Sequence, residues 1–109
     1  MDNPTDKIIV ISNLPDQGSA TRLAEILISR GQAACVNVLA PCTSIYHWQD
    51  KTESTQEVPV LIKTTQEKYA EVERTIRTHH PYELPEIVYV PIAGGLPSYL
   101  DWISKETSR

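Results

Sequence analysis

Two adjacent histidines, His79 and His80, offer the side chains best suited to chemistry in this sequence, and two carboxylates, Glu83 and Glu86, follow them closely. Neutral imidazoles together with carboxylates suit borderline divalent ions such as Cu(II), Ni(II) and Zn(II). Neighbouring residues point about 100° apart on a helix and in opposite directions on a strand, so spacing alone does not direct both rings to one ion. One histidine could instead interact with a helix C-terminus while the other packs at an interface. Both interpretations stay open.

Cys35 is a second candidate, because a thiolate beside a base can act as a nucleophile. It belongs to an apolar stretch, Cys35–Leu39, in which a free cysteine usually serves as a small hydrophobic residue. The loop expected at residues 13–18 contains no arginine that could hold a phosphate, and no Gly-x-x-x-x-Gly-Lys motif occurs. We therefore expect a protein that is not an enzyme.

Aromatic residues provide a further pattern, because they could line either a pocket for a small ligand or an interface between subunits. Interfaces between subunits are enriched in aromatic side chains, which favours the interface. We expect Tyr46, Trp48, Tyr82 and Trp102 to contribute to it. A pocket for a small ligand remains the alternative.

The histidines are expected to lie between a helix and a strand. Before them, apolar residues recur at helical spacing, and Thr64 with Glu67 has the spacing of a capping box at the helix start. Pro81 ends this helix, because it lacks an N–H and disfavours α geometry in the preceding residue. Ile87–Ile92 is a β-branched and aromatic run typical of a strand. The apolar helical positions are Tyr69, Val72 and Ile76.

The pattern of the N-terminal part of the chain predicts a strand followed by a helix. Residues 7–14 contain the continuous apolar run Ile8–Ile11, typical of a central strand buried on both faces. A helix follows, with Asp16 or Ser19 as its cap and Gly31 at its C-terminal end. Its apolar residues recur at i, i+3, i+4, i+7 and i+8: Ala20, Leu23, Ala24, Leu27 and Ile28.

The longest strand is predicted over residues 33–48. Pro41 interrupts this strand, and we expect a bulge or an edge there. A polar turn joins it to a return strand with alternating apolar residues around Val60, so the two form an antiparallel hairpin. Residues 96–103 read as a short closing helix. The order βαββαβα predicts an α+β sandwich of the ferredoxin-like type, in which an antiparallel sheet carries its helices on one face.

The predicted hairpin is too long for its domain. A compact domain of this length is on the order of 35 Å wide, whereas an uninterrupted strand over 33–48 would measure roughly 50 Å. The hairpin must therefore bend sharply or project. A projecting hairpin that carries Ile45, Tyr46, Trp48 and Leu61 would expose apolar surface and unpaired edges unless another subunit covered them.

Length and charge narrow the class of protein. The chain of 109 residues suits one domain over 1–109. A formal net charge of −4 gives no basic surface for nucleic acid, and no apolar run is long enough to cross a membrane. The N-terminus is acidic and polar, unlike a signal peptide. Cys35 and Cys42 are too far apart along an extended strand to form a disulfide, so we expect a reduced, cytoplasmic protein.

The sequence also contains four spaced motifs: Ala33–Asn37, Ser44–Trp48, Leu61–Thr65 and His79–Glu83. Together they resemble the CutA family, which is named for divalent-cation tolerance, and the resemblance extends from Ile8 to about Trp102. It implies a ferredoxin-like homotrimer, similar in architecture to the PII signalling proteins, whose long hairpin strands pair with neighbouring subunits. The resemblance implies no particular reaction.

The resemblance also implies ligands for copper, namely the paired histidines and a cysteine at the end of the first strand. The histidines correspond to His79 and His80, but Ser12 stands at the cysteine position. A serine hydroxyl is a poor ligand for a soft metal, so Cys35 is the thiol that remains within the family pattern. We expect a homotrimeric binding or signalling protein linked to copper or other divalent-metal tolerance. The alternative is a PII-like sensor that binds a metabolite between subunits and regulates a partner protein.

Overall fold

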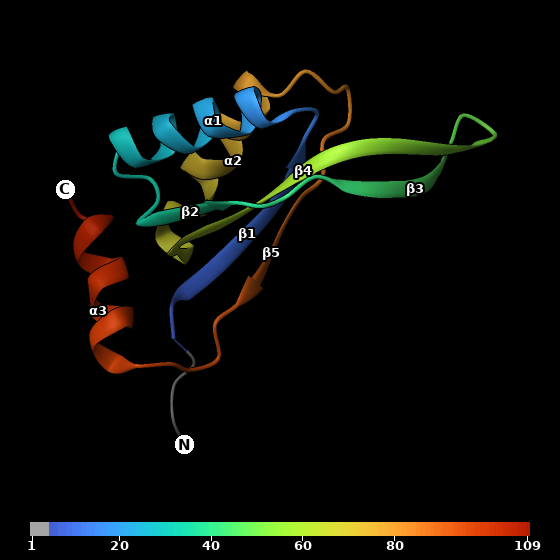
Figure 1. Ribbon diagram of the computed structural model, residues 1–109. Helices are drawn as coiled ribbons and strands as arrows, with labels where there is room; N and C mark the ends of the chain where they lie inside the picture. The colour runs from blue at the N-terminus through green and yellow to red at the C-terminus, as the bar shows by residue number, and fades with distance from the viewer. Residues whose placement is uncertain (1–4) are drawn as a thin grey trace.

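The computed structural model describes residues 5–109, which form a five-stranded antiparallel sheet and three α-helices (Figure 1). The strand order is β2-β4-β1-β5, and β3 also pairs with β4. The α+β fold expected from the sequence is thus confirmed. The elements are β1 (Lys7–Leu14), α1 (Gln17–Ser29), β2 (Cys35–Val38), β3 (Cys42–Trp48), β4 (Lys51–Thr65), the 3-10 turn η1 (Gln66–Lys68), α2 (Tyr69–His79), β5 (Ile87–Pro91) and α3 (Pro97–Glu106).

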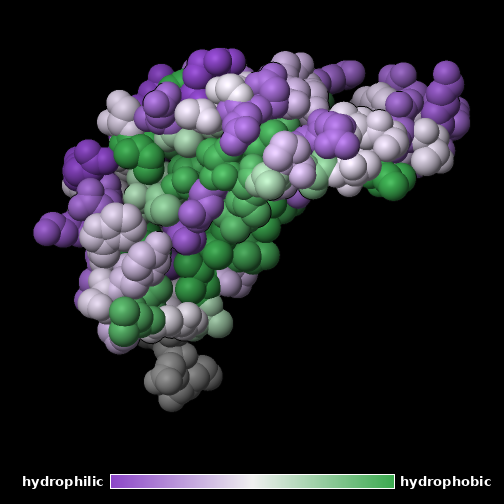
Figure 2. Space-filling model, viewed as in Figure 1, coloured by the Kyte–Doolittle hydropathy of each residue, from purple (hydrophilic) through white to green (hydrophobic). Residues whose placement is uncertain are grey.

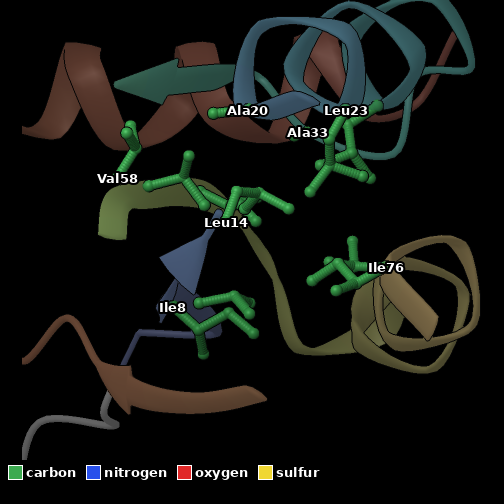
Figure 3. Packing of buried hydrophobic residues seen from close by; sticks show 12 residues of the cluster. Ile8, Leu14, Ala20, Leu23, Ala33, Val58 and Ile76 are labelled. Atoms are coloured by element: carbon green, nitrogen blue, oxygen red, sulfur yellow. The ribbon is translucent and has the colours of Figure 1, made fainter. Parts of the chain in front are cut away.

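The core lies between one face of the sheet and the helices α1 and α2 (Figure 3). Alternate residues of β1, beginning with Ile8, point into it and are fully buried. Ile9 and Ile11 point to the other face and are only half-buried. The expectation that β1 is buried on both faces is therefore wrong for the single chain, because α1 and α2 cover one face only. The helices contribute Ala20, Leu23, Leu27, Val72 and Ile76 to the core.

The ends of α1 follow the local sequence. The Asp16 carboxylate accepts a hydrogen bond of 2.7 Å from the Ser19 backbone N–H, and this contact holds the pKa of Asp16 below its usual range. Gly31, at φ +68°, takes the left-handed conformation just past the helix end, which glycine adopts without strain. Both ends of this helix were predicted, and both predictions are confirmed.

The predicted capping box at the start of α2 is wrong. Thr64 belongs to β4, where it pairs with Ile8 and points into the core. Its hydroxyl donates a 2.7 Å hydrogen bond to the buried carbonyl of Gln32 instead of capping a helix. A 3-10 turn, Gln66–Lys68, precedes α2, and its N-cap residue makes no side-chain hydrogen bond. Leaving the buried Gln32 carbonyl without a donor would cost more free energy than losing the helix cap, so Thr64 donates to the carbonyl.

The hairpin both bulges and projects. β2 and β3 pair with the same strand, but Val38 faces Val60 whereas Cys42 faces Glu57. Three residues, 39–41, thus lie opposite two, 58 and 59, which places one extra residue around Pro41, where a break was expected. Beyond the bulge, β3 and the first half of β4 extend away from the rest of the domain (Figure 1). The described chain, hairpin included, has extents of 46 × 32 × 23 Å.

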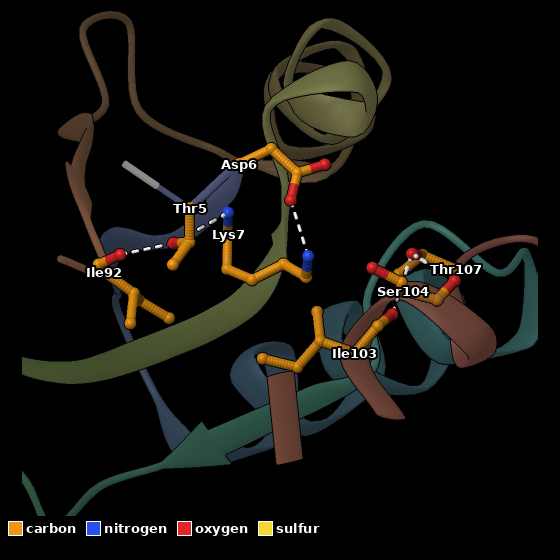
Figure 4. Close-up of polar contacts among 7 residues, drawn as sticks. All are labelled: Thr5, Asp6, Lys7, Ile92, Ile103, Ser104 and Thr107. Carbon is orange, nitrogen blue, oxygen red and sulfur yellow. Dashed lines mark hydrogen bonds and ion pairs between the residues drawn. The ribbon is translucent and has the colours of Figure 1, made fainter. Parts of the chain in front are cut away.

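α3 lies across one end of the sheet, near the C-terminal end of α1 (Figure 1). Its Ile103 is fully buried, while its Tyr99 ring lies 5.7 Å from the ammonium of Lys63. The hydroxyl of Thr107 donates to the Ile103 carbonyl at 2.8 Å and closes the helix, and the hydroxyl of Thr5 donates to the Ile92 carbonyl beside β5 (Figure 4). The expectation of helices on one face therefore holds for α1 and α2, whereas α3 contacts the sheet end.

The sheet face away from α1 and α2 is apolar and uncovered in the single chain. Figure 2 shows a continuous hydrophobic area over the sheet. On the edge strand β5, Val88 and Val90 pair with Ile11 and Ile9, share their face and are 48 % and 45 % exposed, whereas Tyr89 points to the other face, where its ring lies 4.7 Å from that of Tyr69. Such a contiguous apolar area, bordered by a strand edge that no described strand pairs with, is typical of an interaction surface. No helix within residues 5–109 is long and apolar enough to cross a membrane.

Candidate functional site

Residues 80–86, here called the corner, connect α2 to β5. α2 ends at His79, because Pro81 follows closely and His80 takes extended backbone angles, φ −93° and ψ 132°. After the corner, Ile87 pairs with Ser12 near the end of β1. The proline and the strand pairing together hold the corner against the end of β1.

His80 is nearly buried, and both of its ring nitrogens have hydrogen-bond partners. Nε2 lies 2.6 Å from the Asn13 carbonyl oxygen, and Nδ1 lies 3.2 Å from the Tyr82 amide nitrogen. Because a carbonyl only accepts and an amide N–H only donates, these partners select the neutral tautomer with its proton on Nε2. The Tyr82 ring packs against the imidazole, with centroids 4.6 Å apart. Either nitrogen must give up a hydrogen bond before it can bind a metal ion.

His79 is exposed and is directed elsewhere. Its Nδ1 lies 2.9 Å from the carbonyl of Thr75, one turn earlier on the same helix. With Nδ1 as the donor, Nε2 carries a free lone pair. The two histidines are therefore adjacent in the chain but contact different elements, His79 its own helix and His80 the end of β1.

The two glutamates of the corner have different surroundings, although both are exposed. Glu86 accepts a 2.8 Å hydrogen bond from the side-chain amide of Asn13 and so ties the corner to β1 a second time. Glu83 lies at the rim of the cleft described below. Neither contact brings a carboxylate to the free nitrogen of His79.

Ser12 and Cys35 lie in different parts of the sheet. Ser12 is fully buried, directly before the residue that accepts from His80, and its hydroxyl oxygen has no hydrogen-bond partner among the described residues. Cys35 pairs with Lys63, whereas Ser12 pairs with Val60, so Cys35 lies three residues farther along β4 and on its other side. Cys35 and Cys42 are both free and half-buried. Cys35 is therefore not positioned to replace a thiol at position 12.

A cleft of about 540 Å³ lies between the corner and the hairpin. Tyr46, Trp48 and Tyr82, which the sequence suggested as interface residues, line it together. Trp102 does not, because it lies on α3 with its ring 5.5 Å from that of Tyr99. The complete lining is Asn13, Ser44, Ile45, Tyr46, Trp48, Thr55, Glu57, Tyr82, Glu83, Leu84 and Glu86.

Glu57 is the lining residue that the sequence did not indicate. It is only 8 % exposed, although it directly precedes the buried Val58 in β4. The alternation of apolar residues in this strand gives no sign that a carboxylate beside it is buried. Burial, followed by the charge of Glu57, raises the pKa of Tyr82, so the Tyr82 hydroxyl stays protonated and available as a donor.

The sequence model of the CutA1 divalent ion tolerance protein family matches residues 8–106. The chain belongs to the CutA family. It is 38 % identical over 99 residues to the divalent-cation tolerance protein CutA of Thermus thermophilus, covering 91 % of this chain and 96 % of that protein. The crystal structure of CutA from Xylella fastidiosa matches with a TM-score of 0.92 and 39 % identity over 94 % of this chain and 99 % of that one.

A CutA structure from Archaeoglobus fulgidus, described as a periplasmic divalent cation tolerance protein, matches with a TM-score of 0.90 and 35 % identity. The match covers 93 % of this chain and 98 % of that one. The resemblance expected from the four motifs is thus confirmed at the level of family and fold. Family membership also connects the chain to divalent-cation tolerance.

The residues of a single CutA chain do not, as placed, fit a divalent metal ion. Within residues 5–109, no three His, Cys, Asp or Glu side chains converge on a point where an ion could sit. Both nitrogens of His80 are occupied, and Ser12 offers a buried hydroxyl where a thiolate would serve a soft metal. His79 has one free nitrogen. A complete ligand set therefore needs a contribution from outside the single chain or a rearranged corner.

Replacing Ser12 by alanine is expected to stabilise the protein by about 1 kcal/mol, because the buried hydroxyl loses its interactions with water and gains no partner. The matched change Thr64→Val is expected to destabilise by about 1–2 kcal/mol, because it leaves the Gln32 carbonyl without its donor. Urea denaturation followed by circular dichroism measures both. A loss of stability in Ser12→Ala would show that the hydroxyl has a partner.

Proposed function

We propose that this protein is a cytoplasmic homotrimer with a binding or signalling role in divalent-metal tolerance. The observation that carries the assembly is the uncovered apolar face of the sheet, which extends to the edge strand β5 and lies beside the exposed hairpin. Burial of apolar area is the main driving force of association, so a second copy of the same chain would be stabilised by covering this face. The number three and the link to metals come from the family.

The corner supports a metal site in which His79 supplies one ligand and a neighbouring subunit supplies the others. His79 has a free ring nitrogen at the surface, and the described residues of one chain do not supply two further ligands to it. In a trimer, a neighbouring subunit can bring Glu83, Glu86 or another group to this nitrogen. Cu(II) and Zn(II) are the ions that imidazole and carboxylate ligands suit best.

Native mass spectrometry of tag-free protein tests assembly and metal binding together. At pH 7.5 with one equivalent of Cu(II) or Zn(II) per chain, the expected species is a trimer that carries metal, and acid should remove the metal because binding requires neutral imidazole. His79→Ala should lose metal, whereas His47→Ala, which removes an exposed histidine of the hairpin, should keep it. A trimer without metal, or equal loading in both variants, contradicts the metal site at the corner.

We propose further that the role is binding rather than catalysis. Cys35, the candidate nucleophile, has the Asn37 side-chain oxygen as its polar neighbour at 4.0 Å rather than a base. Assays with acetyl phosphate and p-nitrophenyl acetate should give no turnover above buffer. Turnover that Cys35→Ala abolishes would contradict this proposal.

The cleft favours a second candidate function, in which the protein senses a small molecule and regulates a partner. A concave site of about 540 Å³ that combines aromatic surface with a few polar groups has the size and composition of ligand sites. The cleft lies along the projecting hairpin, so a bound ligand could change how the hairpin meets a partner. A sensor requires that the assembled protein binds a ligand in this cleft, whereas a cleft with only a structural role binds none. The calorimetry described in the next subsection distinguishes the two.

A further inference from the structure

The cleft between the corner and the hairpin has an unusual balance of charge. Three of its eleven lining residues are glutamates, Glu57, Glu83 and Glu86, and none is lysine, arginine or histidine. Three others are the aromatic residues Tyr46, Trp48 and Tyr82. Negative charge and aromatic faces therefore surround the same space. Both attract cations, carboxylates by direct charge and aromatic rings through the negative potential over their faces.

Glu57 is the least exposed of the three glutamates that line the cleft. It is 92 % shielded from solvent, since only 8 % of its surface is exposed, yet no lysine, arginine or histidine of residues 5–109 forms an ion pair with it. Its polar neighbour is the neutral hydroxyl of Tyr82. A cation brought next to this carboxylate would therefore meet no competing positive charge.

A metal ion does not fit this position well. Carboxylates must approach a common point within about 2.5 Å to coordinate a divalent ion, and the three glutamates do not form such a group in the described chain. Glu86 is, in addition, hydrogen-bonded to Asn13. The free volume is also far larger than one ion needs. An organic cation has a charged end and an apolar part. It could therefore contact Glu57 with its charge and the aromatic side chains of the cleft with its apolar part.

We propose that this cleft binds a small organic cation, a primary amine carried on a flat apolar group, with its ammonium at Glu57 and its apolar part against Tyr46. The inference rests on the second proposed function, ligand binding by the cleft, and names the ligand class. Glu83 and Glu86 contribute negative potential at the rim. The Tyr82 hydroxyl, kept protonated, is a second polar group beside the ammonium position.

Calorimetry with tryptamine hydrochloride as the probe tests the ligand class. The wild-type assembly should bind tryptamine in the micromolar to low millimolar range, and N-acetyltryptamine, which has the same ring but no charge, should bind at least tenfold more weakly. Equal affinity for the two compounds, or no heat of binding up to 10 mM tryptamine, overturns the proposal.

Variants test the position of the charge. Glu57→Gln keeps the size of the side chain and should weaken tryptamine binding roughly tenfold or more, because a charge-assisted hydrogen bond is lost. Glu67→Gln removes the same charge from an exposed residue before α2 and should leave the affinity within twofold of wild type. Unchanged affinity in Glu57→Gln overturns the proposed ammonium position.

The same samples separate failure of this inference from failure of the proposed assembly. Sedimentation of wild type and of Glu57→Gln reports the oligomeric state without any ligand. A trimer that fails to bind tryptamine overturns the organic-cation site and leaves the proposed assembly intact. A monomer that binds tryptamine supports the site and contradicts the trimer.

Discussion

Trp48→Glu is expected to dissociate the assembly or unfold the chain, the largest effect of any single change that we predict. Trp48 ends β3 on the projecting hairpin and is 37 % exposed in the single chain. In the proposed trimer a neighbouring subunit covers the end of the hairpin at Trp48, and a carboxylate buried there without a partner costs on the order of several kcal/mol per subunit. Size-exclusion chromatography with light scattering should show the loss of the trimer.

A matched control separates this effect from a simple change in net charge. Thr21→Glu adds the same charge to an exposed position of α1, the helix on the opposite side of the sheet from the apolar face. It should leave both the mass of the assembly and its melting temperature close to those of wild type. If Trp48→Glu also remains a folded trimer, the hairpin is not part of the interface.

The second large effect concerns the two histidines. His80→Ala should lower the free energy of unfolding by about 3 kcal/mol, because it leaves the Asn13 carbonyl and the Tyr82 amide without their partners in a buried setting. His79→Ala should change it by less than about 0.5 kcal/mol, because that side chain is exposed. Guanidinium denaturation of the two variants, measured side by side, compares them directly.

Similar costs for the two substitutions would contradict the structural role assigned to His80. The difference also bears on metal binding. Loss of metal from a variant that lacks His80 could reflect a disrupted corner, so His79→Ala is the variant that reports on a ligand. Ser12→Cys provides a second test, because a thiol next to the corner should strengthen the binding of thiophilic metals if the corner can rearrange to reach them.

The sequence predicted most of the fold because local patterns and global packing agree. The apolar spacing of α1, its Asp16 cap and Gly31 all reappear in the structure. The hairpin was predicted from two strand patterns joined by a polar turn, its projection from its length, and the break near Pro41 from the missing N–H of proline. The capping box failed because Thr64 is placed by strand pairing with Ile8 rather than by its local sequence.

The candidate site was harder to predict, since it depends on contacts between distant segments. Two adjacent histidines suggest a shared role, yet the structure joins one to Thr75 and the other to Asn13, 67 residues away. The burial of Glu57 arises from the packing of the corner against the hairpin, which no periodicity encodes. Sequence patterns thus located the right segments but not the partners of their side chains.

Sedimentation velocity of the tag-free protein from 1 to 50 µM tests the central proposal most directly. We expect a single species with three times the mass of the chain at every concentration, because neighbouring subunits would cover the apolar sheet face, the β5 edge and the end of the hairpin at once. Unfolding by denaturant should then occur at a midpoint that rises with protein concentration. A folded monomer that sediments as one species across this range, with its apolar face open to solvent, would contradict the account.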